Sequence, residues 1–227
     1  MAKNKLPKII VHDSISLDGS FVNFEFSMEL MGLHYQIASR FRSEMSIMGS
    51  TTAAKSIEMF GGFTPETKSD FNKPEKKEGQ TYWVIPDSKG TLKGKLHFFR
   101  RSEYCKDVIV LVSEKTDKAY IKYLKERNYD FLVSGTDRVD LRSAISMLSE
   151  KYGPDTIMID SGRSLTNAFI NDGLVDEISV LIVPTVVGEN ARNLFSEIKK
   201  NTDLKLIETE SFGNGFVWIR YSVVKKY

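Results

Sequence analysis

Short apolar segments rich in β-branched residues alternate with segments of helical periodicity along most of this chain, and this alternation restricts the fold more than any other feature. The clearest buried strand lies in DVIVLVSEKT, where five apolar residues run from Val108 to Val112. Tyr120, Tyr123 and Leu124 follow at helical spacing. Strands separated by helices usually pair in parallel. The sequence therefore predicts an α/β fold with a mostly parallel central sheet flanked by helices.

The same two patterns locate the other elements. Strands are expected at Lys8–Ser16, 44–50, Tyr82–Pro86, DFLVSG, DTIMID and VDEISVLIVP, and helices are expected after a cap at Ser27, over Thr51–Met59, after a cap at Asp140 and in RSLTNAFI. The end of the chain differs, because LKLIETESFGNGFVWIRYSVV holds two strand patterns about a Phe-Gly-Asn-Gly turn. Alternation in its second strand leaves Val217, Ile219 and Tyr221 on one face. We expect a C-terminal antiparallel hairpin.

Residues from about 61 to 97 interrupt the alternation with a polar, lysine-rich excursion broken by Pro65 and Pro74. It resembles a loop extending from a sheet more than a domain boundary, so we predict one domain over residues 1–227. Two interpretations of the excursion stay open, a cover over a site and a solvated insertion without a role.

Charge and cysteine content narrow the function classes. With 32 Lys and Arg against 30 Asp and Glu, the formal charge of +2 gives no reason to expect a nucleic-acid or anionic-membrane partner. No apolar run approaches the length of a membrane span, and the chain lacks a recognisable secretory signal, so we expect a cytoplasmic protein. Cys105 has no neighbouring Cys or His at metal-ligand spacing, so we interpret it as a packing residue and expect no metal site. His12 is interpreted as a hydrogen-bonded core residue.

Two glycine corners between a strand and a helix have the composition of anion sites. They are Gly49–Thr52 and Ser161–Leu165, and both combine a small residue with hydroxyl side chains. In parallel sheets, ligands gather at the carboxyl ends of strands, where helix N-termini carry partial positive charge. Two such corners suit the diphosphate of a dinucleotide. The alternative is that Gly49 and Gly162 only permit tight turns.

The stretch IMGSTTAAKS misses the P-loop pattern by one position, because Ala54 stands where the second glycine belongs. A Cβ there hinders the backbone from curling around a phosphate. A P-loop-like phosphotransferase that uses Lys55 is kept as an alternative. The chain also lacks the Gly-x-Gly-x-x-Gly fingerprint of dinucleotide-binding folds.

Several motifs in order resemble one family over almost the whole chain. SLDG, MGSTT, VDLRSAISML, IMIDSGRSLTNAFINDGLVDEISVLIVPTVVG and the closing hairpin resemble the reductase domain of riboflavin biosynthesis, which forms the C-terminal half of bifunctional pyrimidine deaminase/reductases and is similar to dihydrofolate reductase in fold. The most specific segment is Gly173–Glu177 followed by a strand, Pro184 and Gly188.

The resemblance implies hydride transfer from NADPH, and it implies a homodimer. Thr52 matches a cofactor-contacting threonine of the family, and DSGRSLTNA resembles its Glu-Gly-Gly segment. Lys115 would favour the 2′-phosphate of NADPH over NADH. The cofactor contacts implied are Gly49, Ser50, Thr51, Thr52, Ser113, Glu114, Lys115, Ser161, Gly162, Arg163, Ser164 and Leu165.

Two carboxylates complete the site that the resemblance implies. Asp18 matches the acid of the Ser-Leu-Asp-Gly loop and is the predicted catalytic and substrate-binding residue, with a turn-forming role as the alternative. Asp160 stands where the family has a substrate-contacting glutamate. The family's Asp-Asp-Pro motif is absent, since Ser56–Glu58 stand in its place.

The expectation is an NADPH-dependent reductase similar to the 5-amino-6-(5-phosphoribosylamino)uracil reductase. The alternatives are a dihydrofolate reductase-like enzyme with another substrate, the phosphotransferase, and a non-catalytic nucleotide-binding protein.

Overall fold

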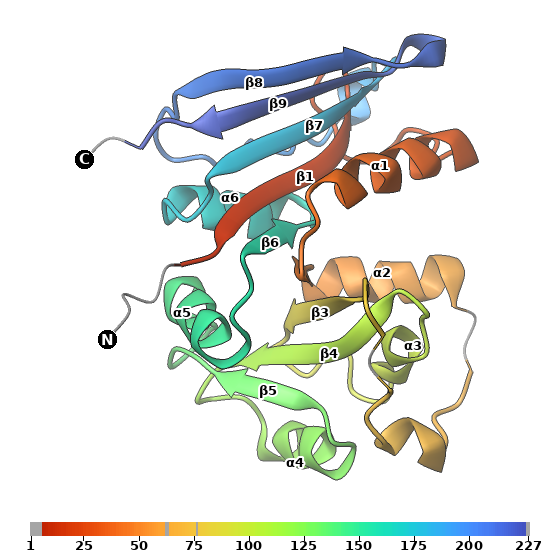
Figure 1. The fold of residues 1–227 in the computed structure, drawn as a ribbon, viewed down its shortest axis with the longest axis vertical. Helices are drawn as coiled ribbons and strands as arrows, with labels where there is room; N and C mark the ends of the chain where they lie inside the picture. The colour runs from red at the N-terminus through yellow and green to blue at the C-terminus, as the bar shows by residue number, and fades with distance from the viewer. Residues whose placement is uncertain (1–5, 62–63, 76, 226–227) are drawn as a thin grey trace. The chain divides into compact units, whose positions relative to one another are not determined.

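The fold was described with a computed structural model, which describes residues 6–61, 64–75 and 77–225. Its internal contacts divide the chain into two compact units. The middle unit comprises Glu44–Asp155 with the segment before β1 (Lys8–Ser16), and the terminal unit comprises Lys8–Ser43 with the chain from Thr156 onward. Figure 1 labels most of the helices and strands of both units. A single domain over residues 1–227 stays a prediction.

The middle unit alternates strands and helices, as the sequence pattern predicted. Its elements are β2 (Met45–Ile47), α2 (Ser50–Phe60), a 3-10 turn (Lys68–Phe71), β3 (Thr81–Pro86), α3 (His97–Arg100), β4 (Cys105–Val112), α4 (Lys118–Glu126), β5 (Asp130–Val133) and α5 (Leu141–Tyr152). The strands lie in the order β5-β4-β3-β2, and every pair is parallel. All four strands therefore end at the same edge of this sheet.

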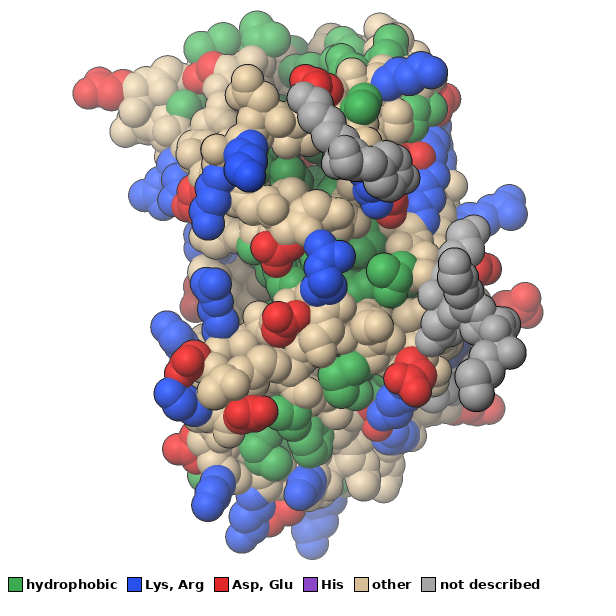
Figure 2. Space-filling view, turned by 90° about the vertical axis from the view of Figure 1, so that its left-hand side faces the viewer, with side chains coloured by type: hydrophobic (Ala, Val, Ile, Leu, Met, Phe, Trp, Pro, Cys, Tyr) green, Lys and Arg blue, Asp and Glu red, His purple; other side chains and the backbone are tan. Residues whose placement is uncertain are grey.

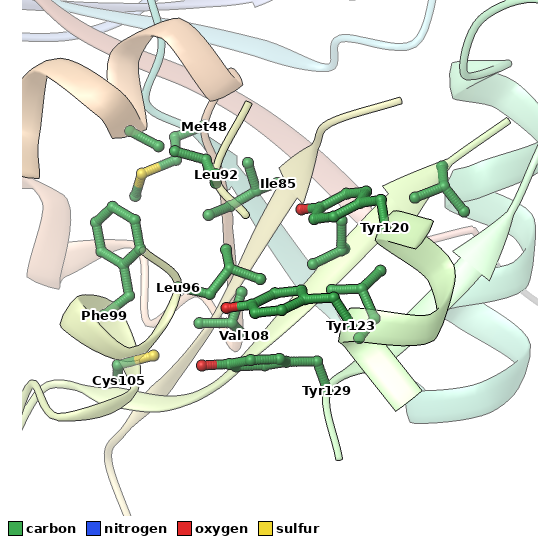
Figure 3. Close-up of a cluster of buried hydrophobic side chains, with 14 residues drawn as sticks. Met48, Ile85, Leu92, Leu96, Phe99, Cys105, Val108, Tyr120, Tyr123 and Tyr129 are labelled. Carbon is green, nitrogen blue, oxygen red and sulfur yellow. The ribbon is translucent and has the colours of Figure 1, made fainter. Parts of the chain in front are cut away.

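One face of the middle sheet is covered by α2, α3 and α4, and the buried side chains of this layer form the cluster in Figure 3. Figure 3 shows the rings of Tyr120, Tyr123 and Tyr129 one above another, with Phe99 and Cys105 across from them. Cys105 is buried, and burial raises the pKa of its thiol to about 12, with Asp107 adding to the effect. Its interpretation as a packing residue is confirmed.

The polar stretch at 61–97 contains an interior strand. β3 lies between β2 and β4, which confirms the strand expected at Tyr82–Pro86. The preceding segment is fastened by ion pairs from Glu66 to Arg127 at 2.6 Å and from Lys73 to Asp130, the first residue of β5, at 2.8 Å. These contacts attach residues 64–75 to the amino-terminal edge of the middle sheet, opposite the edge that holds Gly49 and Ser113.

The terminal unit combines parallel and antiparallel pairing. Its elements are β1 (Lys8–Ser16), α1 (Met28–Arg40), β6 (Thr156–Ile159), α6 (Arg163–Asn171), β7 (Glu177–Val183), a 3-10 turn (Gly188–Asn190), β8 (Leu204–Ser211), a second 3-10 turn (Gly213–Gly215) and β9 (Val217–Val223). The order is β6-β1-β7-β9-β8. β6, β1 and β7 are parallel, whereas β9 pairs antiparallel with both β7 and β8. The predicted hairpin is confirmed.

The core of the terminal unit lies between its sheet and α1. Ser27 caps α1 by accepting the amide of Leu30 at 3.2 Å, as the sequence predicted. Leu30 and Ile37 of the helix are fully buried against Leu181 and Trp218 of the sheet. On β9, the face of Val217, Ile219 and Tyr221 is half-buried, and Trp218 on the opposite face is 1% exposed. The alternation in the sequence therefore predicted which residues of β9 share a face, but it did not predict which face is more buried.

Each unit contains one of the two tryptophans of the chain. Trp83 lies on β3, half-buried, with its ring 5.2 Å from that of Phe99. Trp218 donates from Nε1 to Ser179 Oγ at 2.7 Å.

The nine described strands belong to one mostly parallel sheet with an antiparallel end, so the predicted mixed α/β fold class is confirmed. Among the described residues, no helix is both long and apolar enough to cross a membrane. The surface drawn in Figure 2 intersperses Lys and Arg with Asp and Glu, in keeping with the small formal charge.

Candidate active site

Two helix N-termini differ from the others in the way they are capped. Among the described helices of nine or more residues, α1, α4 and α5 are capped by the side chains of Ser27, Asp117 and Asp140. In contrast, α2 and α6 have the N-caps Gly49 and Gly162, and neither has an acidic residue in its first turn. Glycine has no side chain with which to occupy the first amide groups of a helix. Neither a capping side chain nor a first-turn carboxylate therefore offsets the partial positive charge of these two helix ends.

The corner Gly49–Thr52 lies directly after β2, at the carboxyl-terminal edge of the middle sheet. Thr51 is exposed, and Gly49, Ser50 and Thr52 are half-buried. The helix begins at Ser50, so the residues that a P-loop would use to encircle a phosphate are helical here. Lys55 lies in the second turn of α2 and is exposed. The geometry is that of a helix N-terminus and not of a P-loop.

The corner Ser161–Leu165 follows β6 in the terminal unit. Gly162 has little room, because a Cβ there would lie 3.1 Å from the Phe21 ring. Thr166 Oγ1 donates to the Ser161 carbonyl at 2.8 Å, and Arg163 pairs with Glu197 at 2.9 Å. Glycine at 162 thus allows the Phe21 loop to pack closely.

Two other first-turn residues of this corner remain accessible to a ligand. Ser164 is exposed and Leu165 is half-buried.

The third predicted group, Ser113–Lys115, lies at the end of β4, on the same sheet edge as Gly49. Ser113 is buried and its amide donates to Thr116 Oγ1 at 3.0 Å. Glu114 is exposed, and its amide donates to the Gly135 carbonyl at 3.0 Å. The ammonium of Lys115 forms an exposed ion pair with Asp137. Exposed pairs of this kind contribute little to stability, so a ligand phosphate can compete for the lysine.

Asp18 connects two loops of the terminal unit. Its Oδ1 accepts from Ser16 Oγ at 2.5 Å and from the Val187 amide at 3.2 Å, and its Oδ2 accepts from the Gly188 amide at 2.8 Å. The Ser16 hydroxyl and then the two amides lower the pKa of Asp18 to about 2. This carboxylate therefore carries no proton at neutral pH. Its predicted catalytic and substrate-binding roles stay predictions.

Asp160 lies at the end of β6, beside a buried polar cluster. His34 Nε2, from α1, is 3.6 Å from Asp160 Oδ2, and His34 Nδ1 is 2.9 Å from Ser14 Oγ. His12 is fully buried, with Nδ1 2.9 Å from Ser179 Oγ and Nε2 3.1 Å from the His34 carbonyl. His12 is thus the hydrogen-bonded core histidine that the sequence predicted, and the two imidazole rings lie 4.4 Å apart.

Asp13 adds a second carboxylate to this cluster. Burial, followed by the charge of Asp160, raises the pKa of Asp13 to about 8. For Asp160, burial acts to raise the pKa, but the neighbouring His34 outweighs it and the pKa is lowered. For His34, burial acts to lower the pKa, but Asp160 and Asp13 outweigh it and the pKa is raised. Burial and then His34 lower the pKa of His12 to about 3, so His12 is neutral.

Asp13 and the polar role of His34 were missed from the sequence. The available signal was the polar run at His12, Asp13, Ser14 and Ser16 inside an otherwise apolar strand. Polar groups in a buried strand need hydrogen-bond partners. A polar run in such a strand can therefore indicate a polar cluster, but it does not show which residues of other elements belong to the cluster. The Asp13–Asp160 juxtaposition depends on the register, in which Val11 pairs with Ile159, the last residue of β6.

The predicted residues divide between the two units. The middle unit holds Gly49–Thr52 and Ser113–Lys115 at one sheet edge, and the terminal unit holds Asp18, Asp160 and Ser161–Leu165. Asp18 follows the part of β1 that pairs with β7, beyond the end of β6. The carboxylate whose charge acts on Asp13 is that of Asp160.

Comparison with known proteins supports the family that the motifs suggested. The RibD C-terminal domain family matches residues 7–218, so the chain belongs to this family. It is 40% identical over 77 residues to an uncharacterized protein of Bacillus subtilis, YyaP, over 34% of this chain and 40% of the relative. It is 34% identical over 87 residues to the 2,5-diamino-6-ribosylamino-4(3H)-pyrimidinone 5′-phosphate reductase of Methanothermobacter thermautotrophicus, over 38% of this chain and 39% of the relative. These matches thus span less than half of each relative.

Solved structures agree in fold. A pyrimidine reductase-like protein from Corynebacterium diphtheriae superposes with a TM-score of 0.70 at 19% identity, over 97% of this chain and 93% of the other. At this identity, the similarity shows the fold alone.

Proposed function

We propose that the protein is an NADPH-dependent reductase whose substrate is a ribosylaminopyrimidine phosphate of riboflavin biosynthesis. The observation that carries the proposal is the pair of glycine-capped helix N-termini, α2 and α6, in a member of the RibD C-terminal domain family. The name of the relative from Methanothermobacter thermautotrophicus, a pyrimidinone phosphate reductase, supports the substrate class.

The donor set of the two corners fits an anionic dinucleotide. Backbone amides of Ser50–Thr52 and Arg163–Leu165, with the hydroxyls of Thr51 and Ser164, would bind phosphate oxygens. Lys115 would pair with a 2′-phosphate, which favours NADPH over NADH. When bound, the nicotinamide supplies hydride. The protein supplies binding, orientation and the accompanying proton.

A binding experiment tests the cofactor. NADPH fluorescence is titrated with the wild type and with Thr52→Asp, beside NADH and ATP at matched ionic strength. Asp at this position stabilises α2 through the helix dipole but repels a phosphate, so we expect binding to weaken by at least about tenfold while Tm is unchanged or higher.

Ser143→Asp is the matched control, because Ser143 occupies the same third position of α5, whose N-terminus Asp140 already caps. Tight NADPH binding by the wild type and Ser143→Asp, lost in Thr52→Asp, supports the proposal. Binding of ATP without NADPH contradicts it and favours the phosphotransferase.

Turnover tests the substrate. NADPH oxidation by the purified protein is followed with the ribosylaminopyrimidine phosphate and with a panel of folates and small carbonyl compounds. Oxidation with the pyrimidine supports the proposal, whereas oxidation only with another compound indicates a reductase of different specificity. NADPH binding without any oxidation indicates a non-catalytic nucleotide-binding protein. A homodimer in the cytoplasm is part of this proposal.

A further inference from the structure

Asp13 lies on β1 beyond the part of this strand that pairs with β6. The last β1–β6 pair is Val11 with Ile159, so Asp13 is two residues beyond the end of β6, although β1 pairs with β7 as far as Ser16. The residue is half-buried, and Oδ1 accepts the amide of Ser14 at 2.8 Å. This hydrogen bond holds the carboxyl group in place.

The charged groups around Asp13 come from three elements. Asp160 follows the end of β6, His34 comes from α1, and His12 is the preceding residue of β1. His34 and Asp160 form an ion pair, and His12 is neutral. Two carboxyl groups thus lie near one imidazole, and both raise its pKa.

A single buried cation compensates only one carboxylate. Asp160 is the carboxylate that pairs with His34, so its charge is the one that is compensated. Asp13 is then the carboxyl group that keeps its proton. The other carboxylate at this end of β1, Asp18, accepts bonds from Ser16, Val187 and Gly188, so it has no proton to donate.

We propose that Asp13 is the acid that protonates the substrate during reduction, an inference that rests on the proposed function. His34 and Asp160 are positioning residues, because they set the charge of Asp13 without donating the proton themselves.

For a substrate with a C=N bond, such as an imine, reduction consists of a hydride transfer and a proton transfer. Hydride adds to the carbon and the π electron pair moves to nitrogen. The O–H bond of Asp13 breaks, an N–H bond forms, and the bonding pair stays on the Asp13 carboxylate. Water then returns a proton to Asp13. The net change is the addition of two electrons and two hydrogens to the substrate.

The test compares Asp13→Asn with a matched Asp155→Asn control, since Asp155 is exposed and lies outside both corners. We expect NADPH affinity within about twofold of wild type in both variants. Turnover at pH 7 should fall by at least about 100-fold in Asp13→Asn alone, as for loss of a general acid. In the wild type, kcat should decrease at high pH as Asp13 loses its proton.

A second measurement does not depend on activity. Carboxyl-carbon NMR of the protein without ligand, with Asp13 assigned through the spectrum of Asp13→Asn, should show this carboxyl group titrating well above pH 5. Titration near pH 4, or turnover retained in Asp13→Asn, overturns the inference and leaves the reductase proposal intact. A wild type that neither binds NADPH nor oxidises it contradicts the reductase proposal itself.

Discussion

The end of β1 and the loop that follows it carry two aspartates only five positions apart, and their surroundings shift the two pKa values in opposite directions. Burial and then the charge of Asp160 raise the pKa of Asp13 to about 8, although His34 acts in the opposite direction. Asp18 accepts bonds from a hydroxyl and two backbone amides, which lower its pKa to about 2. One strand end thus provides a carboxyl group that keeps its proton and a loop anchor that is charged at neutral pH.

Because both residues are aspartates, the difference between their pKa values comes from the groups around each carboxyl group and not from the residue type. Amides that point at a carboxylate favour its charged form, whereas burial beside a second carboxylate favours the neutral form. Sequence similarity selects Asp18 as the acid because it lies in a family motif, and the contacts favour Asp13. Four substitutions test this comparison.

The largest expected effect on stability is that of Asp18→Ala. It leaves the amides of Val187 and Gly188 without their acceptor, so we expect Tm at pH 7 to fall by roughly 4 to 8 °C. The folded pKa of Asp18 lies below its ordinary value, so its stabilisation is present above about pH 4 and is lost as the pH falls toward 2. Calorimetry at pH 7, 4 and 2.5 should therefore show the two melting curves converging. A constant difference in Tm contradicts the role of the charge.

Asp13→Asn should have a smaller effect of opposite sign. The folded pKa of Asp13 lies above its ordinary value, so wild-type stability decreases as the pH rises from about 4 to 8. Asn resembles the protonated acid and does not titrate, so this residue adds no pH dependence to the stability of the variant. We expect equal Tm values at pH 4 and a gain of about 2 to 4 °C for Asp13→Asn at pH 8. A loss of Tm at pH 8 would indicate that Asp13 is an ionised partner of His34.

The smallest effects are on the Asp13 pKa itself. Asp160→Asn removes the neighbouring negative charge and should lower the pKa of Asp13 by about one pH unit or more. His34→Gln removes the compensating cation and should raise it. Carboxyl-carbon NMR of both variants measures the two shifts, and shifts of the same sign contradict the three-group arrangement.

Local pattern predicted most of the fold. The caps at Ser27 and Asp140, the inner face of α4 and the C-terminal hairpin follow from short-range spacing, which is set by helix and strand geometry alone. The sequence also predicted β3 as a strand, but it did not predict the position of this strand between β2 and β4. Strand order depends on contacts between distant segments, which periodicity does not encode.

The candidate site was only partly predictable for the same reason. The glycine corners could be found because each is a local strand-to-helix junction. The environment of Asp18 depends on amides about 170 positions away, at Val187 and Gly188. That of Asp13 depends on the residue at which β6 ends and on the packing of α1 against β1. Neither relation appears in a local window of sequence.

The placement of one indole in each unit gives the protein two built-in optical reporters. Replacing either Trp83 or Trp218 by Phe leaves a chain whose remaining fluorescence reports on a single unit. Coincident denaturation midpoints in the two single-tryptophan chains would mean that the units unfold as one cooperative body, and separate midpoints would mean that each has its own stability.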